Sequence, residues 1–259
     1  MQCYTWGMVK RILKPFISMI VPCYKAETFI VSSLTHVDAQ MRRLTRDYEI
    51  ICVVDGKVDN TFDLASNLAK KLRNIRVVSY LKNRGKGYAV RYGMKLAKGK
   101  CVGFIDAGGE IDPASLVELV KIFNEKKADI VVGSKRHPNS DIVYPPLRRV
   151  FSFVYLYFVK MLFGIKLSDT QAGIKLFRKE AIKKLLPNLR VNGFAFDIEM
   201  LTLAKIFGFK GIYEAPIKVR MVKGETASTI GNIWQLVNTS FEMVYDSLKL
   251  YSRIQRGKL

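Results

Sequence analysis

The segment that constrains the fold most is an apolar run that ends abruptly in an acidic loop. Cys101–Ile105 has the composition of a strand buried on both faces, and the run stops at Asp106. Two glycines follow, which let the backbone approach a ligand closely, and Pro113 then opens a helix. Ligands of open α/β sheets bind at the carboxyl ends of strands, so a carboxylate here suits a divalent cation that holds a diphosphate. The alternative is an acidic turn in which Asp112 caps the following helix.

Similar apolar runs alternate with helical segments through the first half of the chain. This alternation predicts an α/β fold with a Rossmann-like, mostly parallel sheet that is flanked by helices and wound with right-handed crossovers. The expected strands are Phe16–Val21, Tyr48–Val54, Ile75–Tyr80, Cys101–Ile105 and Asp129–Gly133.

The second half of the chain is less regular. It begins with a polar loop that contains three prolines, and it ends with a long amphipathic helix. The expected elements are the loop Ser134–Pro146, an aromatic helix over Leu147–Phe163, a strand over Ile174–Phe177, a strand over Gly211–Met221 interrupted by Pro216, and the final helix Ile233–Ile254.

Composition limits the class of protein and of partner. The chain has 259 residues of which 49% are hydrophobic, which suits one large α/β domain. Its formal net charge of +21 favours an anionic partner, such as nucleic acid, anionic lipid or a phosphorylated ligand. The cysteines lack C-x-x-C spacing and three of them fall in or just after expected strands, which indicates buried free thiols in a reducing compartment. The four cysteines are Cys3, Cys23, Cys52 and Cys101.

Three segments combine apolar and basic residues as interfacial helices do. Val150–Leu167 is the longest apolar stretch, but Lys160 and Gly164 interrupt it, so we do not interpret it as a membrane span. Met1–Lys14 is basic and amphipathic and shows no cleavage site of a secretory signal, and Ile233–Ile254 ends in a basic tail. We therefore expect a membrane-associated protein bound to the cytoplasmic face by interfacial helices. An ordinary buried helix is the alternative for Val150–Leu167.

Polar residues at the ends of the first three expected strands suit a nucleotide. The ring of Tyr24 can stack on a base, and Asp55 can accept hydrogen bonds from a base or a ribose, although turn formation alone also explains Asp55. Lys86 lies in a short glycine loop before a helix, where a phosphate would meet backbone N–H groups and the helix dipole. A capped helix start is the alternative for this loop.

Basic residues bracket the loop before the aromatic helix. Lys135 and Arg136 lie at the start of this loop, and Arg148 and Arg149 follow it. Ser152 lies one turn after Arg148, so both side chains can face the same way. Arginine beside an interfacial aromatic surface suits a lipid phosphate, and a solvated basic face is the alternative.

A series of motifs follows in a characteristic order along the chain. They are V-P-C-Y, V-D-G-x-x-D-N-T, N-R-G-K-G-Y-A-V-R-Y-G-M, F-I-D-A-G-G, G-S-K, D-T-Q-A-G-I-K-L-F-R-K-E-A and G-F-A-F-D-I-E-M. In this order the chain resembles family 2 glycosyltransferases of GT-A fold over residues 17–224. Within the family it looks most like dolichyl-phosphate glucosyltransferases and, more distantly, dolichyl-phosphate mannose synthases.

The resemblance implies a metal ion and two candidate catalytic carboxylates. The family usually reads D-A-D where this chain has Asp106-Ala107-Gly108, so the second metal carboxylate is missing. Glu110 matches a family position that also binds metal, and we expect Asp106 and Glu110 to share a Mg²⁺ or Mn²⁺ ion. Asp169 and then Asp197 are the candidates for an assisting or orienting carboxylate.

The resemblance also implies which residues bind the two substrates. The acceptor phosphate would be held by Arg148 and Ser152. The residues expected to bind the nucleotide-sugar donor are Pro22, Tyr24, Glu27, Val53, Asp55, Lys86, Asp106, Ala107, Lys135 and Arg220.

The activity implied by the resemblance is inverting transfer of a hexose to polyprenyl or dolichyl phosphate, with UDP-glucose as the expected donor. Transfer from GDP-mannose, and transfer to a non-lipid glycan, are the alternatives. The charge alone would also suit a nucleic-acid-binding protein, but these motifs do not, so no nucleic-acid partner is expected. We expect a basic tail over residues 1–14, the glycosyltransferase domain over residues 15–227, and an amphipathic helix with a basic end over residues 228–259.

Overall fold

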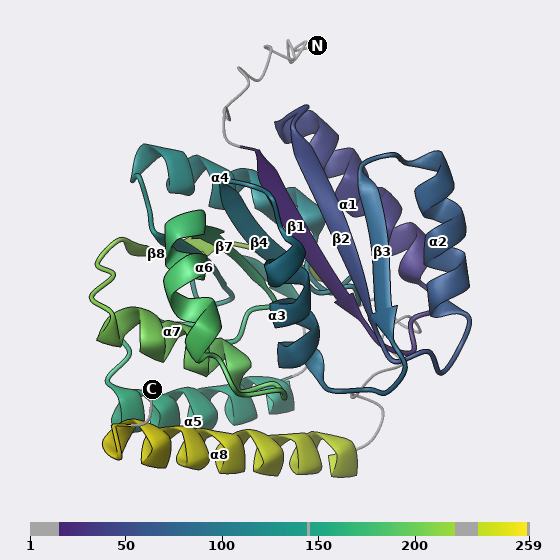
Figure 1. The fold of residues 1–259 in the computed structure, drawn as a ribbon. Coiled ribbons are helices and arrows are strands. Elements are labelled where there is room, and N and C mark those ends of the chain that lie inside the picture. The colour runs from purple at the N-terminus through teal and green to yellow at the C-terminus, as the bar shows by residue number, and fades with distance from the viewer. Residues whose placement is uncertain (1–15, 144–145, 221–232, 258–259) are drawn as a thin grey trace, which may run out of the picture.

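The computed structural model describes residues 16–143, 146–220 and 233–257, except for the side chains of residues 146–151 and 233–237. A seven-stranded sheet in the order β3-β2-β1-β4-β7-β5-β8 forms its centre, with helices on both faces (Figure 1). The strands are β1 (Ile17–Cys23), β2 (Tyr48–Asp55), β3 (Ile75–Tyr80), β4 (Cys101–Ile105), β5 (Ile130–Ser134), β6 (Asp141–Val143), β7 (Ile174–Arg178), β8 (Ile212–Pro216) and β9 (Lys218–Arg220).

The helices alternate with these strands as the sequence predicted, and the mostly parallel α/β sheet is confirmed. They are α1 (Ile30–Leu44), α2 (Thr61–Lys71), α3 (Lys86–Leu96), α4 (Leu116–Glu125), α5 (Pro146–Phe163), α6 (Lys179–Leu185), α7 (Phe196–Ile206) and α8 (Ile233–Gln255), with short 3₁₀ turns η1 (Pro113–Ser115) and η2 (Leu186–Asn188).

One strand departs from the parallel pattern. β7 lies between β4 and β5 and runs antiparallel to both. Ile105, the last residue of β4, therefore pairs with Ile174, the first residue of β7. Because of this reversal, the segment before β7 meets the loop after β4, and Asp106 N–H donates to the carbonyl of Gly173 at 2.9 Å.

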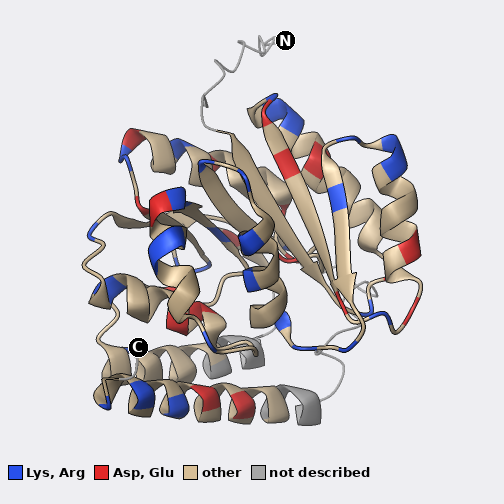
Figure 2. Cartoon of the chain, viewed as in Figure 1, with Lys and Arg blue, Asp and Glu red and all other residues tan. Residues whose placement is uncertain are grey.

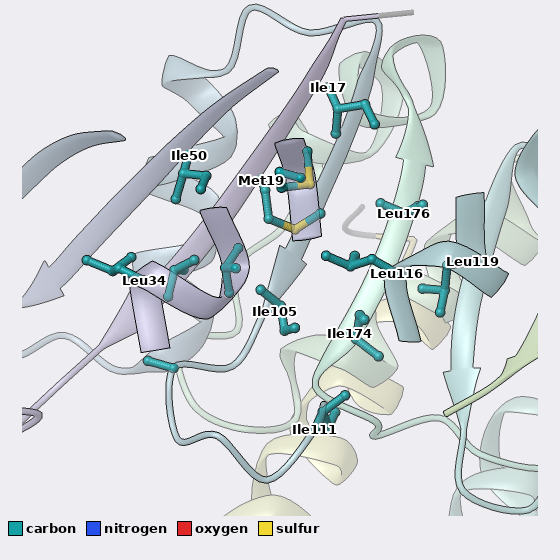
Figure 3. Close-up of a cluster of buried hydrophobic side chains, with 14 of the residues drawn as sticks. Ile17, Met19, Leu34, Ile50, Ile105, Ile111, Leu116, Leu119, Ile174 and Leu176 are labelled. Carbon is teal, nitrogen blue, oxygen red and sulfur yellow. The ribbon is translucent and has the colours of Figure 1, made fainter. Parts of the chain in front are cut away.

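Helices cover both faces of the sheet, so the central strands bury both sets of side chains. On one face, Met19 packs in a cluster with Leu34 of α1 and Leu116 of α4 (Figure 3). On the other, Ile20 and Phe104 pack with α3, α5, α6, α7 and α8. Burial on both faces accounts for the continuous apolar composition of these strands.

Two further elements form a small second sheet. The loop predicted over Ser134–Pro146 contains β6, which pairs in parallel with β9. Pro216 separates β8 from β9, as the expected interruption at this proline indicated. Ser140 stabilises the connection by accepting a hydrogen bond from the backbone N–H of Ile217 at 3.0 Å.

The helices α5 and α8 lie side by side along one edge of the domain (Figure 1). The hydroxyls of Tyr155 and Ser247 form a buried hydrogen bond of 2.8 Å between them. On its outer side in this view, α8 carries a mixture of acidic and basic residues (Figure 2). No helix in the described part of the chain is both long and apolar enough to cross a membrane.

The cysteines match the expectation wherever they are described. Cys23, Cys52 and Cys101 are buried free thiols. Cys3 and the rest of the segment Met1–Lys14 lie outside the described residues.

Two glycines give a matched test of the packing around β4. A Cβ at Gly103 would lie 2.4 Å from the side chain of Leu176, whereas a Cβ at Gly108 would meet no atom within 4 Å. We expect Gly103→Ala to lower the free energy of unfolding by about 1–3 kcal/mol through overpacking, and Gly108→Ala to change it by less than about 0.5 kcal/mol. Denaturant unfolding of both variants measures the difference, and equal stabilities would contradict this packing of β4 against β7.

Candidate active site

The first two strand ends are tied together by hydrogen bonds between their loops. Ala26 N–H donates to the Thr61 hydroxyl at 2.8 Å, and Glu27 accepts from the N–H of Asn60 at 3.0 Å. These contacts fix the loop after β1 against the loop after β2. The ring of Tyr24 remains 39% exposed at this rim, where a planar ligand has access to it.

Two of the expected donor-binding residues lie deeper in the sheet. Pro22 and Val53 are register partners on β1 and β2, and both are buried. They lie beneath the loops that follow β1 and β2 and support these loops.

Asp55 orders the loop that follows β3. This carboxylate is 3% exposed and accepts hydrogen bonds from the N–H groups of Arg84 at 2.7 Å and Gly85 at 2.9 Å. The side-chain amide of Asn83 donates to it at 3.0 Å. The carboxylate is therefore engaged by the protein in this structure, and its expected contact with a nucleotide stays a prediction.

The glycine loop around Lys86 is a capped helix start rather than an open cradle of N–H groups. The N–H groups of Gly87 and Tyr88 donate to the carbonyl of Asn192, at 2.7 Å and 3.3 Å. In this structure the chain itself engages these two amides, and the expected contact of the loop with a phosphate stays a prediction. The side chain of Lys86 is the part of this loop that points to the acidic loop after β4.

Lys86 and Asp106 form a close ion pair at the carboxyl end of β4. The Lys86 ammonium lies 2.8 Å from Oδ2 and 2.7 Å from Oδ1 of Asp106, but only the contact with Oδ2 has hydrogen-bond geometry. Burial lowers the pKa of Lys86, but the charges of Asp106 and Asp197 outweigh it, so this pKa lies above its ordinary value. Lys86 is thus a cation at neutral pH. Ala107, the next residue after Asp106, is buried.

A second ion pair lies beneath the first, fully enclosed. Lys175 of β7 is 0% exposed, and its ammonium donates to Asp197 at 2.5 Å and to the carbonyl of Ala172 at 2.8 Å. Burial raises the pKa of Asp197 and lowers that of Lys175, in each case against the attraction of the partner. Sequence reasoning did not single out Lys175, although a lysine within an apolar strand was its signal. This pairing favours an orienting role for Asp197.

Asp169 lies close to Lys135 at the start of the D-T-Q block. The Asp169 side chain is almost completely buried; Oδ2 accepts from the N–H of Lys135 at 3.0 Å, and Oδ1 accepts from the N–H of Gln171 at 2.9 Å. The Lys135 ammonium is 3.5 Å away. Burial raises the pKa of Asp169, but the charge of Lys135 and the two N–H groups outweigh burial, so the pKa lies below its ordinary value. Asp169 is therefore a carboxylate at neutral pH.

Glu214 of β8 holds this turn in place, a function that the sequence analysis missed. It accepts from the hydroxyl of Ser168 at 2.6 Å and from the N–H of Asp169 at 3.0 Å. An acidic residue within a strand was the signal that could have indicated it.

Arg136 connects the same turn to α5. Its guanidinium donates to the carbonyl of Ser168 at 3.3 Å and to the hydroxyl of Ser152 at 3.0 Å. Ser152, expected at the acceptor phosphate, therefore lies beside a described arginine. The side chain of Arg148 lies outside the described residues.

Glu110 and Arg220 meet through their backbones. The N–H of Arg220 donates to the carbonyl of Glu110 at 2.9 Å. The guanidinium of Arg220 forms an ion pair of 2.7 Å with Asp141, with both side chains at least half exposed. The expected contact between Arg220 and a diphosphate stays a prediction.

The acidic loop suits a divalent cation at one position. Oδ1 of Asp106 is a buried oxygen without a hydrogen bond, and no atom lies within 4 Å of a Cβ built at Gly108 or Gly109. The Lys86 ammonium lies 2.7 Å from this oxygen, but without hydrogen-bond geometry, and a carboxylate oxygen of this kind is a ligand that a hard cation binds. No group of three or more His, Cys, Asp or Glu side chains in the described ranges could hold a metal ion by itself, so the remaining ligands would come from a substrate or water.

The buried carboxylate of Asp169 gives a pH-dependent test of this geometry. Its folded-state pKa is depressed, so it stabilises the fold above its unfolded pKa of about 3.9, and this contribution is lost as the pH falls through the folded-state value. We expect Asp169→Asn to lower the free energy of unfolding at pH 7 by about 1–3 kcal/mol, and the difference from the parent to shrink below about pH 4. Urea unfolding over this pH range measures it, and a deficit that is independent of pH would contradict the assignment.

Comparison with known proteins identifies the family. The profile described as "Glycosyl transferase family 2" matches residues 18–186. The "Dolichyl-phosphate beta-glucosyltransferase" of Drosophila melanogaster is 34% identical over 206 residues, which are 73% of this chain and 62% of that protein. The Homo sapiens protein of the same name is 30% identical over 207 residues, which are 74% of this chain and 63% of that protein. This chain thus spans less than two thirds of the length of these relatives.

Solved structures confirm the GT-A fold. Glucosyl-3-phosphoglycerate synthase from Mycobacterium tuberculosis, in a complex with Mn²⁺, uridine diphosphate and phosphoglyceric acid, superposes with a TM-score of 0.69 at 20% sequence identity. The match covers 92% of this chain and 79% of that one. Because the family profile matches well over half of the residues, and the sheet and its order of elements agree with this fold, the chain belongs to glycosyl transferase family 2.

Proposed function

We propose that this chain transfers glucose from a nucleotide sugar to dolichyl phosphate, with inversion at the anomeric carbon. The observation that carries the proposal is the pairing of β4 with β7, which brings the Asp169–Gly173 block beside Asp106. The curated relatives named above are dolichyl-phosphate beta-glucosyltransferases, which supports glucose and a lipid phosphate as substrates.

The donor is proposed to bind over the carboxyl ends of β1, β2 and β4. The base of this site is formed by Pro22, Val53 and Asp55. Tyr24 offers an exposed ring to the nucleotide base. Glu27 supports the rim by holding the second loop. UDP-glucose is the proposed donor, because the synthase with the same fold binds uridine diphosphate. GDP-mannose is the alternative.

Asp106 and Glu110 are proposed to hold Mg²⁺ or Mn²⁺ together with the diphosphate. When bound, the cation would offset charge that develops on the leaving diphosphate. Lys86 and Lys135 add two positive charges from the protein on either side of the acidic loop. Arg220 would contribute a third if its exposed ion pair with Asp141 opens.

The acceptor needs placement more than it needs a strong base. A phosphate monoester has a second pKa of about 6, so it is largely a dianion at pH 7 and already a competent nucleophile. Arg148 and Ser152 are proposed to hold this phosphate, and Arg136 holds the Ser152 hydroxyl in place. Asp169, ionised and fixed by its hydrogen bonds, orients Lys135 rather than moving a proton.

The surface of α5 and α8 is proposed to lie on the cytoplasmic face of a membrane. On α5 the side chains of Phe153, Val154, Tyr157 and Met161 are exposed by 52%, 62%, 60% and 79%, and on α8 Phe241, Tyr245 and Leu248 are exposed by 71%, 66% and 47%. Apolar and aromatic side chains on two adjacent helices suit the interfacial region of a bilayer. A lipid acceptor would then reach the site without leaving the membrane.

The activity is tested with the purified chain, dolichyl phosphate, and UDP-glucose, UDP-N-acetylglucosamine or GDP-mannose. We expect glucose transfer that requires Mg²⁺ or Mn²⁺, and a loss of at least about 100-fold in kcat for Asp106→Asn, because removal of one charged transition-state contact has an effect of this size. The control is Asp112→Asn, which keeps an acceptor for the N–H of Ala114 and should retain the parent rate. Preference for a water-soluble glycan acceptor, or for GDP-mannose, would contradict the proposal.

Membrane association is tested by flotation with anionic liposomes. We expect the parent to float at low salt and to be partly released by high salt, because each Lys or Arg near an anionic surface contributes on the order of 1 kcal/mol. The double variant Phe153→Ser, Met161→Ser should float less. The control Val58→Ser, Leu81→Ser removes two exposed side chains, 52% and 83% accessible, from the loops after β2 and β3, and should float like the parent. Retention through both high salt and alkaline carbonate would instead indicate a true membrane span.

A further inference from the structure

The position of Lys86 has a consequence for the order in which ligands bind. Its ammonium lies within 2.8 Å of both carboxylate oxygens of Asp106, the residue proposed to hold the cation. An ammonium and a divalent cation that share one carboxylate repel each other at short range. The protein without ligands therefore already carries a counter-ion where the metal would bind.

Glu110 is the other acidic side chain proposed to hold the cation, and its charge also acts on Lys86, but Asp106 is the carboxylate that the ammonium contacts. The family's second aspartate is replaced by Gly108, and Asp197 is already engaged by Lys175. The rings of Phe194 and Phe196 lie 5.9 Å and 5.8 Å from the Lys86 ammonium, so they flank it without neutralising it.

Four backbone N–H groups of the same loop are already engaged by the protein. The N–H groups of Arg84 and Gly85 donate to Asp55, and those of Gly87 and Tyr88 donate to Asn192. Among the described cationic side chains of this loop, Lys86 is the one in contact with Asp106, so its ammonium can turn from Asp106 to a phosphate oxygen.

We propose that Lys86 is an exchangeable counter-ion that couples the divalent cation to the nucleotide diphosphate. Without the nucleotide, the ammonium neutralises Asp106 and opposes cation binding. When the cation and the diphosphate arrive together, the cation takes Asp106 and the ammonium passes to the diphosphate. Each ligand then raises the affinity for the other by the same factor, because binding linkage is reciprocal. This inference rests on the proposed function only in its choice of ligands.

Binding measurements on the purified chain test the proposal without any turnover. Mn²⁺ is titrated through the loss of the paramagnetic resonance signal of the free ion, with and without UDP. In the parent we expect weak Mn²⁺ binding that UDP tightens by about 10-fold or more. In Lys86→Met we expect Mn²⁺ alone to bind about 10-fold more tightly than in the parent, UDP to bind more weakly, and the coupling factor to fall by about 10-fold or more to what direct contact between the cation and the diphosphate provides.

Three comparisons separate this role from a general effect of charge or of misfolding. Lys82→Met removes an exposed lysine of the same loop and should behave like the parent, and Lys86→Arg should keep the coupling. Lys86→Gln repeats the test with a second neutral side chain. The rise in melting temperature on adding Mn²⁺ is measured for both proteins. A larger rise in Lys86→Met than in the parent would support the proposal and show that the variant is folded.

Unchanged or weaker Mn²⁺ affinity in folded Lys86→Met, or parent-like coupling by UDP in that variant, would overturn the inference and leave the proposed function standing. A parent protein that binds neither Mn²⁺ nor UDP would overturn the proposed function and the inference with it.

Discussion

The antiparallel pairing of β7 with β4 is the constraint on which the rest of the site depends. In a fully parallel sheet the amino end of β7 would lie at the edge opposite to Asp106. Because β7 is reversed, Gly173 accepts a hydrogen bond from the N–H of Asp106, and a Cβ at Gly173 would lie only 1.8 Å from the Asp106 carboxylate. The glycine is needed at this position because two loops that are 67 residues apart in sequence share one small space. Asp169, four residues before it, is brought to the same edge.

Three enclosed charged pairs organise the half of the molecule that contains α5, α7 and α8. Lys175 pairs with Asp197, Lys135 with Asp169, and Arg253 of α8 with Glu199 of α7 at 2.6 Å. Glu199 also accepts from the N–H groups of Arg190 and Val191. Removing one partner of the fully buried Lys175–Asp197 pair is expected to cost about 3–5 kcal/mol, because the other is left as an uncompensated buried charge. These pairs therefore specify how the second half of the chain docks on the sheet more than they add to stability.

The first half of the fold can be read from the sequence, because its signals are local. The strands over Phe16–Val21, Tyr48–Val54 and Cys101–Ile105 are mostly apolar, and a polar loop follows each of them, so type and approximate boundary follow from the same residues. The orientation of β7 is not local in this sense. Its apolar residues are compatible with a parallel or an antiparallel orientation, and only the pairing with β4 and β5 determines that β7 is antiparallel.

In the candidate site, too, some residues can be predicted from local sequence signals and others depend on long-range contacts. Asp106, Asp169 and Lys86 stand out because motifs place them next to strand ends. Glu214 and Lys175 do not, since a single charged residue within a strand carries no indication of its partner. For Asp55 the motif is clear but the partners are not. Its three hydrogen-bond donors come from the loop after β3, and they reach Asp55 only because the ends of β2 and β3 lie close together in the fold.

The helix α5 is where the site and the outer surface of the protein meet. Ser152 faces inward to Arg136, whose neighbour Lys135 contacts Asp169, while Phe153 is 52% exposed. Successive residues of a helix point about 100° apart, so one turn of α5 can present a hydroxyl to the site and an aromatic ring to the outside. For the proposed acceptor this arrangement has a direct physical meaning. A lipid phosphate is a charged group attached to an apolar chain. Its phosphate needs a basic site and its chain needs an apolar surface, so both are satisfied only where two such surfaces adjoin. The chain provides that boundary within a single helical turn, which supports the proposal that the apolar surface of α5 and the neighbouring Lys135 and Arg136 form parts of one acceptor site.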